Sequence, residues 1–389
     1  MKRTFNILGL LLLLFAPVLL QASPNPRHIS FNFYGDTIQF DLDSSCVLPV
    51  DRPITQQALE SFYESLSAAS FQSIVSVLIT YKTVHKPDDW FFYQLIRRTA
   101  QQISPKEANY ERYTAYKWFL LRQCGYDALL TFASDKLLFY VQSDDKIYNI
   151  PTRISLNKQY ICLNYHDYGL IDFNLYSFKE ITLPTLAGFS SFSYKITRLP
   201  EFAASDYREK EIHFQFYNTN YQFKIKLNTQ IQQLFANYPV LDYSFYFDIP
   251  LSTGTYSSLI PQLKKNLASM RTKDGVDYLM RFTRYAFLYQ KDEDGFGKEK
   301  RMSAEETLLY DKSDCEDRVA LFFYLVKEIY DLPMIVLTND EHVTLAVQLQ
   351  RPIGQTILYN GQKYSICEPT PQGEDIRMGQ LSPAAAKQP

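Results

Sequence analysis

The sequence has no marked excess of positive or negative charge. Its 389 residues include 40 Lys and Arg against 42 Asp and Glu, which leaves a formal net charge of −2. The charged residues are dispersed along the chain, so no basic stretch offers the electrostatic footprint that binds nucleic acid or an anionic membrane. We therefore expect neither nucleic acid nor a membrane surface as a partner.

Glycine and the common ligand-binding motifs are also scarce. The chain has 13 Gly against 30 Tyr and 28 Phe, a composition typical of an ordered globular protein rich in strand-forming residues. It holds no G-x-G-x-x-G, no Walker A and no H-E-x-x-H motif, and its acidic stretches lack the ligand spacing of an EF-hand loop. We accordingly expect neither a cofactor nor a metal.

A long hydrophobic run occurs at the N-terminus. Two basic residues precede an apolar stretch from Ile7 to Leu20, and the small residues Ala22 and Ser23 follow it. This order is that of a secretory signal peptide, and the apolar part is shorter than the ~20 residues that span a bilayer. We expect cleavage near Ala22, export to the periplasm, the cell envelope or the medium, and no stable membrane span afterwards; a retained anchor is the weaker alternative.

Cysteine is sparse and odd in number. In an oxidising compartment an odd count leaves at least one thiol without an intramolecular partner. Spacing alone does not say which, so the pairing among Cys46, Cys124, Cys162 and Cys367 stays open. A bond between Cys367 and Cys315 is a further alternative, and it would block the Cys315 thiol. The five residues are Cys46, Cys124, Cys162, Cys315 and Cys367.

Hydrophobic periodicity divides the chain into segments. Residues 23–145 combine a strand pair at 29–43 with helical patterns and a second strand pair, which predicts an α+β region. Residues 146–254 alternate β-branched and aromatic side chains, which predicts a mostly antiparallel β-rich module. Helical periodicity returns within 255–372, and the tail 373–389 has little to bury, so we expect it to be flexible. The predicted fold class is α+β.

Two stretches of the chain share one order of elements. Residues 110–141 and 315–346 each read as a helix, a short turn and two strands. An ungapped alignment pairs Tyr110 with Cys315 and Leu137 with His342. The simpler explanation is chance similarity between two ordinary units; the alternative is an ancient duplication whose first copy, within 23–145, has lost the polar residues.

A cysteine stands at the head of an apolar helical pattern near the C-terminus. Ser313, followed three residues later by Glu316, fits a capping box that starts the helix. Cys315 then lies in the first turn, where the helix dipole stabilises an anion by roughly 0.3 to 1 kcal/mol. One pKa unit corresponds to ~1.4 kcal/mol, so the dipole alone does not offset Asp314, Glu316 and Asp317. A reactive thiolate here needs a cationic partner, and an imidazolium is the natural one.

A histidine and a carboxylate follow in a suitable order. His342 begins the second of two strand patterns that are joined by a polar tip, and the next hairpin, with Asn-Gly at its turn, ends at Glu368. A helix-borne thiol, a strand-borne imidazole and a carboxylate on the adjacent strand are the parts of a catalytic triad. Taken singly, Cys315 and His342 are well explained as core residues; their order together favours a site.

These motifs resemble those of the transglutaminase-like superfamily. Its pattern is approximately G-D-C-x-D, then H-x-W-x-x-V, then a strand ending in D-P-T; here the stretches are S-D-C-E-D, H-V-T-L-A-V and C-E-P-T. The similarity covers residues 255–372 and implies a papain-like domain there, preceded by the α+β region and the β-rich module. It implies Cys315 as nucleophile, His342 as general base and Glu368 as the orienting acid, with Tyr289 as the candidate for holding the oxyanion.

Three residues depart from the family pattern. Ser313 stands where Gly is common, Thr344 where an aromatic residue is common, and Glu368 where Asp is usual. Because Glu is longer by one methylene, its carboxylate must sit further back or reach differently to meet the imidazole.

The resemblance implies a bacterial exported cysteine peptidase or amidase. It would cleave protein or peptide amides through a thioester intermediate. Hydrolysis is favoured over cross-linking, because the sequence shows nothing that would exclude water from the site. The alternatives are a catalytically inactive scaffold or binding protein of the cell envelope, and a cross-linking transglutaminase. The sequence leaves open the substrate, the acyl acceptor, metal dependence, the oligomeric state and the role of the first two thirds of the chain.

Overall fold

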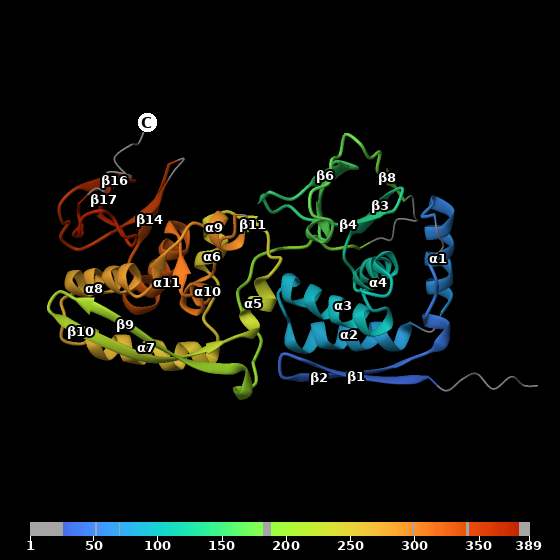
Figure 1. Ribbon diagram of the computed structural model, residues 1–389, viewed down its shortest axis with the longest axis horizontal. Helices are drawn as coiled ribbons and strands as arrows, with labels where there is room; N and C mark the ends of the chain where they lie inside the picture. Colours follow the sequence, from blue (N-terminus) through green and yellow to red (C-terminus); the bar gives the residue numbers. More distant parts are fainter. Residues whose placement is uncertain are drawn as a thin grey trace, which may run out of the picture.

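The computed structural model describes residues 26–50, 53–69, 71–181, 188–297, 299–339 and 342–380. The predicted signal peptide, residues 1–22, lies outside the described residues. The described chain folds into two lobes that lie side by side (Figure 1). We call residues 26–203 the N-terminal lobe and residues 204–380 the C-terminal lobe. Both lobes mix helices and strands, so the chain is an α+β protein.

The N-terminal lobe contains β1 (Arg27–Phe33), β2 (Asp36–Leu42), η1 (Ser44–Cys46), α1 (Gln56–Ala68), α2 (Gln72–His85), α3 (Asp89–Ile103), α4 (Tyr110–Gln123), β3 (Ala128–Ala133), β4 (Lys136–Gln142), β5 (Ile147–Tyr148), β6 (Thr152–Ser155), β7 (Lys158–Cys162), η2 (Tyr165–Asp167) and β8 (Lys179–Glu180). No single helix among the described residues is long and apolar enough to cross a membrane, and α1 and α2 pass that test only as a pair bent by 81°.

The C-terminal lobe contains η3 (Ala204–Asp206), β9 (Tyr207–Phe216), β10 (Thr219–Asn228), α5 (Gln230–Phe235), β11 (Val240–Leu241), α6 (Tyr243–Phe247), α7 (Thr253–Leu267), α8 (Thr272–Tyr285), β12 (Leu288–Tyr289), α9 (Asp292–Phe296), α10 (Ala304–Leu309), β13 (Lys312–Ser313), α11 (Cys315–Tyr330), β14 (Met334–Thr338), β15 (Val343–Val347), β16 (Thr356–Tyr359) and β17 (Gln362–Cys367).

The first strand pair forms as the sequence predicts. β1 and β2 are antiparallel, with Phe33 opposite Asp36 across a two-residue turn. Both turn residues have positive φ, Tyr34 at 50° and Gly35 at 94°, which suits the twist of a tight hairpin. A side chain at Gly35 would also meet the carbonyl oxygen of Glu201 at 2.7 Å. The turn therefore requires glycine for both conformation and space.

The two lobes contain sheets of the same topology. In the N-terminal lobe α4 precedes four strands arranged β6-β7-β4-β3, with β8 added at the edge. In the C-terminal lobe α11 precedes four strands arranged β14-β15-β17-β16. In both sheets the fourth strand returns beside the second and leaves the third at an edge. Each helix packs on its own sheet, α4 against β3 and β4 and α11 against β15.

Residues 146–254 are divided between the lobes, which revises the expectation of one β-rich module. β6 to β8 extend the sheet begun by β3 and β4, so that sheet crosses the boundary drawn at residue 145. β9 and β10 form a separate hairpin that packs on α8 and α7 of the C-terminal lobe. Alternating side chains identify the strands, but they do not say which helices will cover the buried face.

The segment after β17 packs on the C-terminal lobe as far as the structure describes it, up to residue 380. Ile376 and Met378 are buried, although the composition of this segment offers little to bury. The amide of Gly379 donates to the carbonyl of Ile366 at 2.8 Å, and its carbonyl accepts from the amide of Gln355 at 2.6 Å. The rest of the tail predicted to be flexible, 381–389, lies outside the described residues.

Candidate active site

The helix that carries the candidate nucleophile has its N-cap one residue after the predicted one, Ser313. Asp314 is the N-cap, and its Oδ1 accepts from the amides of Glu316 at 3.0 Å and Asp317 at 3.2 Å. Asp317 returns the bond by accepting from the Asp314 amide at 3.3 Å. The prediction of a box formed by Ser313 and Glu316 is therefore wrong. Ser313 is held in the two-residue strand β13, and Asp is as good an N-cap as Ser.

The Cys315 sulfur meets the start of strand β15. The backbone N–H of Val343 lowers the pKa of the Cys315 thiol, so this strand start faces the sulfur. His342 precedes Val343 directly, so the helix start and the strand start bring the predicted nucleophile and base to one place. The packing of α11 on β15 maintains this approach.

His342 and Glu368 form the second half of the predicted constellation. His342 Nε2 lies 2.7 Å from Glu368 Oε2, and the two residues are 7% and 1% exposed. The other carboxylate oxygen, Oε1, accepts from the amide of Thr370 at 3.0 Å. Because Nε2 is engaged by the carboxylate, Nδ1 is the ring nitrogen that remains to exchange a proton with a thiol.

Glutamate fits where the family pattern has aspartate, and a buried arginine helps to place it. The carbonyl of Glu368 accepts from Nε of Arg284 at 3.0 Å and also from Nη2. Nη1 of the same guanidinium donates to Ile376 at 2.7 Å, so helix α8 and the C-terminal segment jointly set this backbone position. The sequence alone did not predict this role of Arg284. The signal that could have indicated it is a basic residue within the aromatic, core-like stripe of α8.

Tyr289 also lies near the thiol. It belongs to β12 and pairs in parallel with Ser313 of β13. Burial raises the pKa of Tyr289, and the negative charge of a Cys315 thiolate raises it further. The structure therefore places the predicted oxyanion candidate within electrostatic reach of the nucleophile, with about half of its side chain exposed.

The electrostatics of Cys315 keep the thiol protonated when it acts alone. Burial raises its pKa to about 12, and the carboxylate of Asp314 contributes in the same direction. The Val343 N–H opposes this shift without cancelling it. Thiolate formation at neutral pH thus requires a partner that accepts the proton, which is the role that His342 is placed to fill.

Three buried carboxylates beside the nucleophile could hold a divalent cation. Oxygens of Asp292, Asp314 and Asp317 all lie within 4.8 Å of one another. Burial, followed by repulsion among the acids, raises the pKa of Asp292 to about 7. The same two causes raise the pKa of Asp314 to about 6 and that of Asp317 well above its usual value. Carboxylate oxygens are ligands that bind Ca²⁺ and Mg²⁺. Asp292 comes from a different segment of the chain than Asp314 and Asp317, so no linear sequence motif could reveal the group.

A cavity of about 300 Å³ adjoins this carboxylate group. Asp292 and Ser313 line it, together with residues 310–312. The Ser313 hydroxyl is buried without a hydrogen-bond partner among the described residues. Ser313 therefore contributes a polar group to the floor of this cavity and does not cap the helix.

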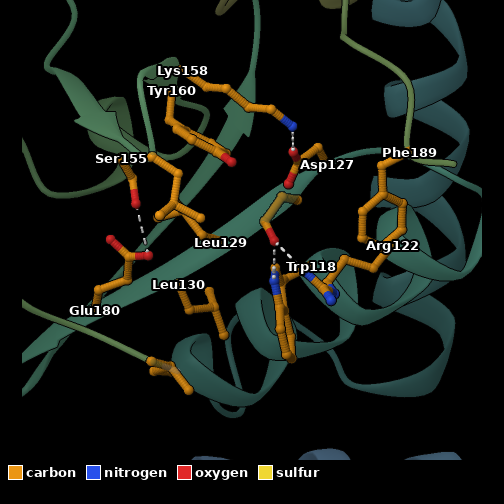
Figure 2. A pocket seen from close by; sticks show the side chains of 13 residues that line it. Trp118, Arg122, Asp127, Leu129, Leu130, Ser155, Lys158, Tyr160, Glu180 and Phe189 are labelled. Carbon is orange, nitrogen blue, oxygen red and sulfur yellow. Dashed lines mark hydrogen bonds and ion pairs between the residues drawn. The ribbon is translucent and has the colours of Figure 1, made fainter. Parts of the chain in front are cut away.

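A second cavity of about 300 Å³ lies in the N-terminal lobe, at the end of α4 that is remote from Tyr110 (Figure 2). Its charged side chains pair with neighbours in the wall. Lys158 lies 2.7 Å from Asp127, and Ser155 donates to Glu180 at 3.1 Å, as the dashed lines in Figure 2 show. This cavity presents no nucleophile and base together.

The five cysteines are all free, which resolves the pairing that the sequence left open. Cys46, Cys124, Cys162 and Cys367 are buried, whereas Cys315 is partly exposed. Cys367 therefore does not block the candidate nucleophile, and Cys315 is the thiol that reagents in solution can reach.

The N-terminal lobe places other residues at the three corresponding positions. Strand β7 ends at Cys162 as β17 ends at Cys367, and the next residue is Leu163 in one lobe and Glu368 in the other. The ungapped alignment of the sequence thus continues through both sheets. It pairs the triad Cys315, His342 and Glu368 with Tyr110, Leu137 and Leu163.

Comparison with known proteins adds no relative. No protein-family model matches the chain, and searches of curated proteins and of solved structures found no match.

Proposed function

We propose that the protein is an exported cysteine peptidase or amidase of the transglutaminase-like type, with a papain-like C-terminal domain. The observation that carries this proposal is the 2.7 Å contact between His342 Nε2 and Glu368 Oε2, next to the helix start that holds Cys315. An acid that orients a histidine beside a partly exposed thiol is the arrangement that thiol acyl transfer needs.

The reaction would proceed in two halves. His342 takes the Cys315 proton, the sulfur attacks the amide carbonyl, and the imidazolium then protonates the amine as the C–N bond breaks. Water, deprotonated by His342, attacks the resulting thioester and releases the acid and the thiol. Glu368 stabilises the imidazolium in both halves. Tyr289 is the candidate donor to the oxyanion.

The proposed substrate is a protein or peptide amide. Tyr243 and Arg301 border the thiol side of the site, and both contact Glu316, at 2.6 Å and 3.3 Å. Burial and the bond to Glu316 raise the pKa of Tyr243, and the negative charge of a Cys315 thiolate acts in the same direction. A rim of aromatic and charged side chains around a partly exposed nucleophile suits an extended peptide, and it leaves water free to resolve the thioester.

Export remains part of the proposal and rests on the order of residues 1–22. The burial of four free thiols is compatible with export, because buried thiols resist oxidation and exchange in an oxidising compartment. A thiolate at Cys315 would be the reactive exception.

The test is covalent trapping of the intermediate. The purified full chain is mixed with a set of peptide amides and activated esters, quenched in acid and analysed by intact and peptide mass spectrometry. We expect an acyl adduct at Cys315 that hydroxylamine removes and that the Cys315→Ala variant lacks. Cys124→Ala is the matched control, since it removes a buried thiol from the other lobe. Turnover that persists in Cys315→Ala would contradict the proposal, and a folded protein with an unreactive Cys315 would indicate the scaffold alternative.

A further inference from the structure

A second polar cluster lies in the N-terminal lobe at the place that corresponds to the candidate active site. Tyr110, the first residue of α4, donates from its hydroxyl to Asp167 Oδ2 at 2.8 Å. The same hydroxyl accepts from Asn164 Nδ2 at 2.8 Å, and this amide also donates to the carbonyl of Leu137 at 2.9 Å. Polar contacts thus link the helix start, the second strand and the end of β7, as in the other lobe.

Basic side chains outnumber acids in this cluster. Lys106 Nζ lies 2.5 Å from Asp167 Oδ1, and His166 Nε2 lies 3.4 Å from the same oxygen. Arg97 and Lys117 act electrostatically on His166 as well, although neither forms an ion pair with a carboxylate among the described residues. Two lysines, one arginine and one imidazole therefore act on Asp167.

Lys117 is the most deeply buried of these cations. It is 1% exposed, and its Nζ lies 4.5 Å from the ring centroid of Tyr113 and 5.7 Å from that of Tyr110. Ring faces stabilise an ammonium group only in part, and a buried ammonium without an anion is costly. Burial accordingly lowers the pKa of Lys117 to about 7 and that of His166 to about 3.

The cluster also contains buried polar atoms that form no hydrogen bond within the described residues. The hydroxyl of Tyr93 and Nε2 of His166 are both buried without a hydrogen bond in the described part of the chain. The charges of Arg97 and Asp167 act on that Tyr93 hydroxyl, which places it within the same cluster. The side chains of Lys106 and His166 are 39% and 23% exposed, so the cluster reaches the surface through them.

We propose that this cluster binds a small oxyanion, a carboxylate or phosphate group, beside Lys117 and His166. An anion there would neutralise the excess positive charge and accept hydrogen bonds from donors that now lack partners. The site is independent of the proposed catalysis and would give the N-terminal lobe a binding role at the position of the other lobe's nucleophile.

The test uses sulfate, with acetate as a second probe, because neither changes its charge between pH 6 and pH 8. The full chain is titrated calorimetrically at constant ionic strength, and thermal unfolding is followed in parallel. We expect saturable binding that is tighter at pH 6, where Lys117 holds its proton, and proton uptake on binding near pH 7. The other groups with shifted pKa values that face Lys117 keep one charge state over this range: Tyr93, Arg97, Tyr110, Tyr113, Cys162, His166 and Asp167. Lys106 also faces this cluster and pairs with Asp167.

Two variants and a matched control decide the outcome. Lys117→Met keeps the volume and removes the charge, and we expect sulfate affinity to fall about tenfold or more. Lys106→Gln, at the exposed side, should weaken sulfate binding less than Lys117→Met does. Because Lys106 is partly exposed, this variant still tests the proposal if Lys117→Met does not fold. Lys82→Met is the control, since Lys82 is also a part-buried amine over a ring, 3.9 Å from the Tyr126 centroid, outside this cluster. Sulfate affinity that is unchanged in Lys117→Met and Lys106→Gln, or reduced equally in Lys82→Met, would overturn the proposal.

Discussion

The two helix-and-sheet units of this protein have one topology and very different polar residues. Both helices start after a side-chain cap, Asn109 in one lobe and Asp314 in the other. Both sheets return their fourth strand beside the second and end it at a buried cysteine. At the three aligned positions, only the C-terminal unit has a thiol, an imidazole and a carboxylate. The comparison shows that apolar positions maintain this arrangement of strands, whereas three substitutable positions decide whether it carries catalytic groups.

The shared topology is also what an internal duplication predicts. Chance similarity of two sequence stretches does not require their third and fourth strands to match, yet the alignment extends to the ends of β7 and β17. The experiments below test how far the functional difference between the units follows from individual residues.

The largest effect is expected at the nucleophile. Replacing Cys315 by Ala should lower peptide amide turnover by about 10³-fold or more, because a nucleophile and its base act as a unit. Cys124→Ala should keep the turnover of the wild type, and circular dichroism should show both variants folded. Steady-state kinetics on the best trapped substrate provide the measurement. Equal loss in both variants would show that activity does not depend on the C-terminal unit specifically.

The acid of the triad should come next. Glu368→Gln should lower kcat by about 10² to 10⁴-fold, since the amide cannot stabilise an imidazolium. Glu368→Asp should cost about tenfold, because the shorter side chain cannot span the 2.7 Å contact without moving the backbone that Arg284 holds.

The corresponding residue in the other lobe gives the comparison. Leu163→Ala should lower the free energy of unfolding by about 2 to 5 kcal/mol and leave kcat of the folded fraction unchanged.

A kcat that rises in Glu368→Asp would show that glutamate is a poor substitute for the aspartate of the family pattern.

The carboxylate group beside Cys315 should make stability depend on pH. A folded-state pKa of about 7 for Asp292 means that folding favours the protonated acid. The free energy of unfolding should therefore fall as pH rises from about 4 to about 7, by about 1 to 3 kcal/mol for this group. Asp292→Asn should remove that part of the slope and stabilise the protein at pH 8, as measured by urea unfolding at several pH values. If the free energy of unfolding depends on pH equally in Asp292→Asn and in the wild type, ionisation of Asp292 does not destabilise the folded protein.

The smallest expected effects concern the two caps. Asp314→Asn keeps a capping side chain and removes a negative charge, so the pKa of Cys315 should fall by about one unit. The pH dependence of its alkylation rate measures this shift. Asn109→Ala should cost about 1 kcal/mol of stability through the lost cap and leave the alkylation profile unchanged. If the pH dependence of Cys315 alkylation is the same in Asp314→Asn as in the wild type, the carboxylate of Asp314 is not a cause of the high pKa of the thiol.

Local patterns allowed prediction of the elements and of the order of the site residues. The β1–β2 pair follows from alternation and the β3–β4 pair from two apolar runs around a polar tip, and the helix start at Cys315 is right to within one residue. The identity of the cap was wrong because β12 pairs with β13 and holds Ser313 in a strand. That pairing joins segments more than twenty residues apart, which a local pattern cannot reveal.

The supporting residues of the site were beyond the sequence for the same reason. Arg284 reaches Glu368 across 84 positions of the chain, and Asp292 joins Asp314 and Asp317 from another segment. Both are ordinary members of a helix when read along the sequence. Their roles exist only once α8, α9 and α11 are packed together.

The measurement that tests the central claim most directly is the pH dependence of Cys315 alkylation by iodoacetamide in the wild type and in His342→Ala. The other four thiols are buried, so the native protein should be modified at Cys315, as peptide mass spectrometry can verify. We predict rapid modification of the wild type near neutral pH, and in His342→Ala a slow reaction that rises only above the ordinary thiol range of about pH 8.5. A thiol that reacts identically in both proteins, or that stays inert at neutral pH in the folded wild type, would contradict the assignment of a Cys-His-Glu site.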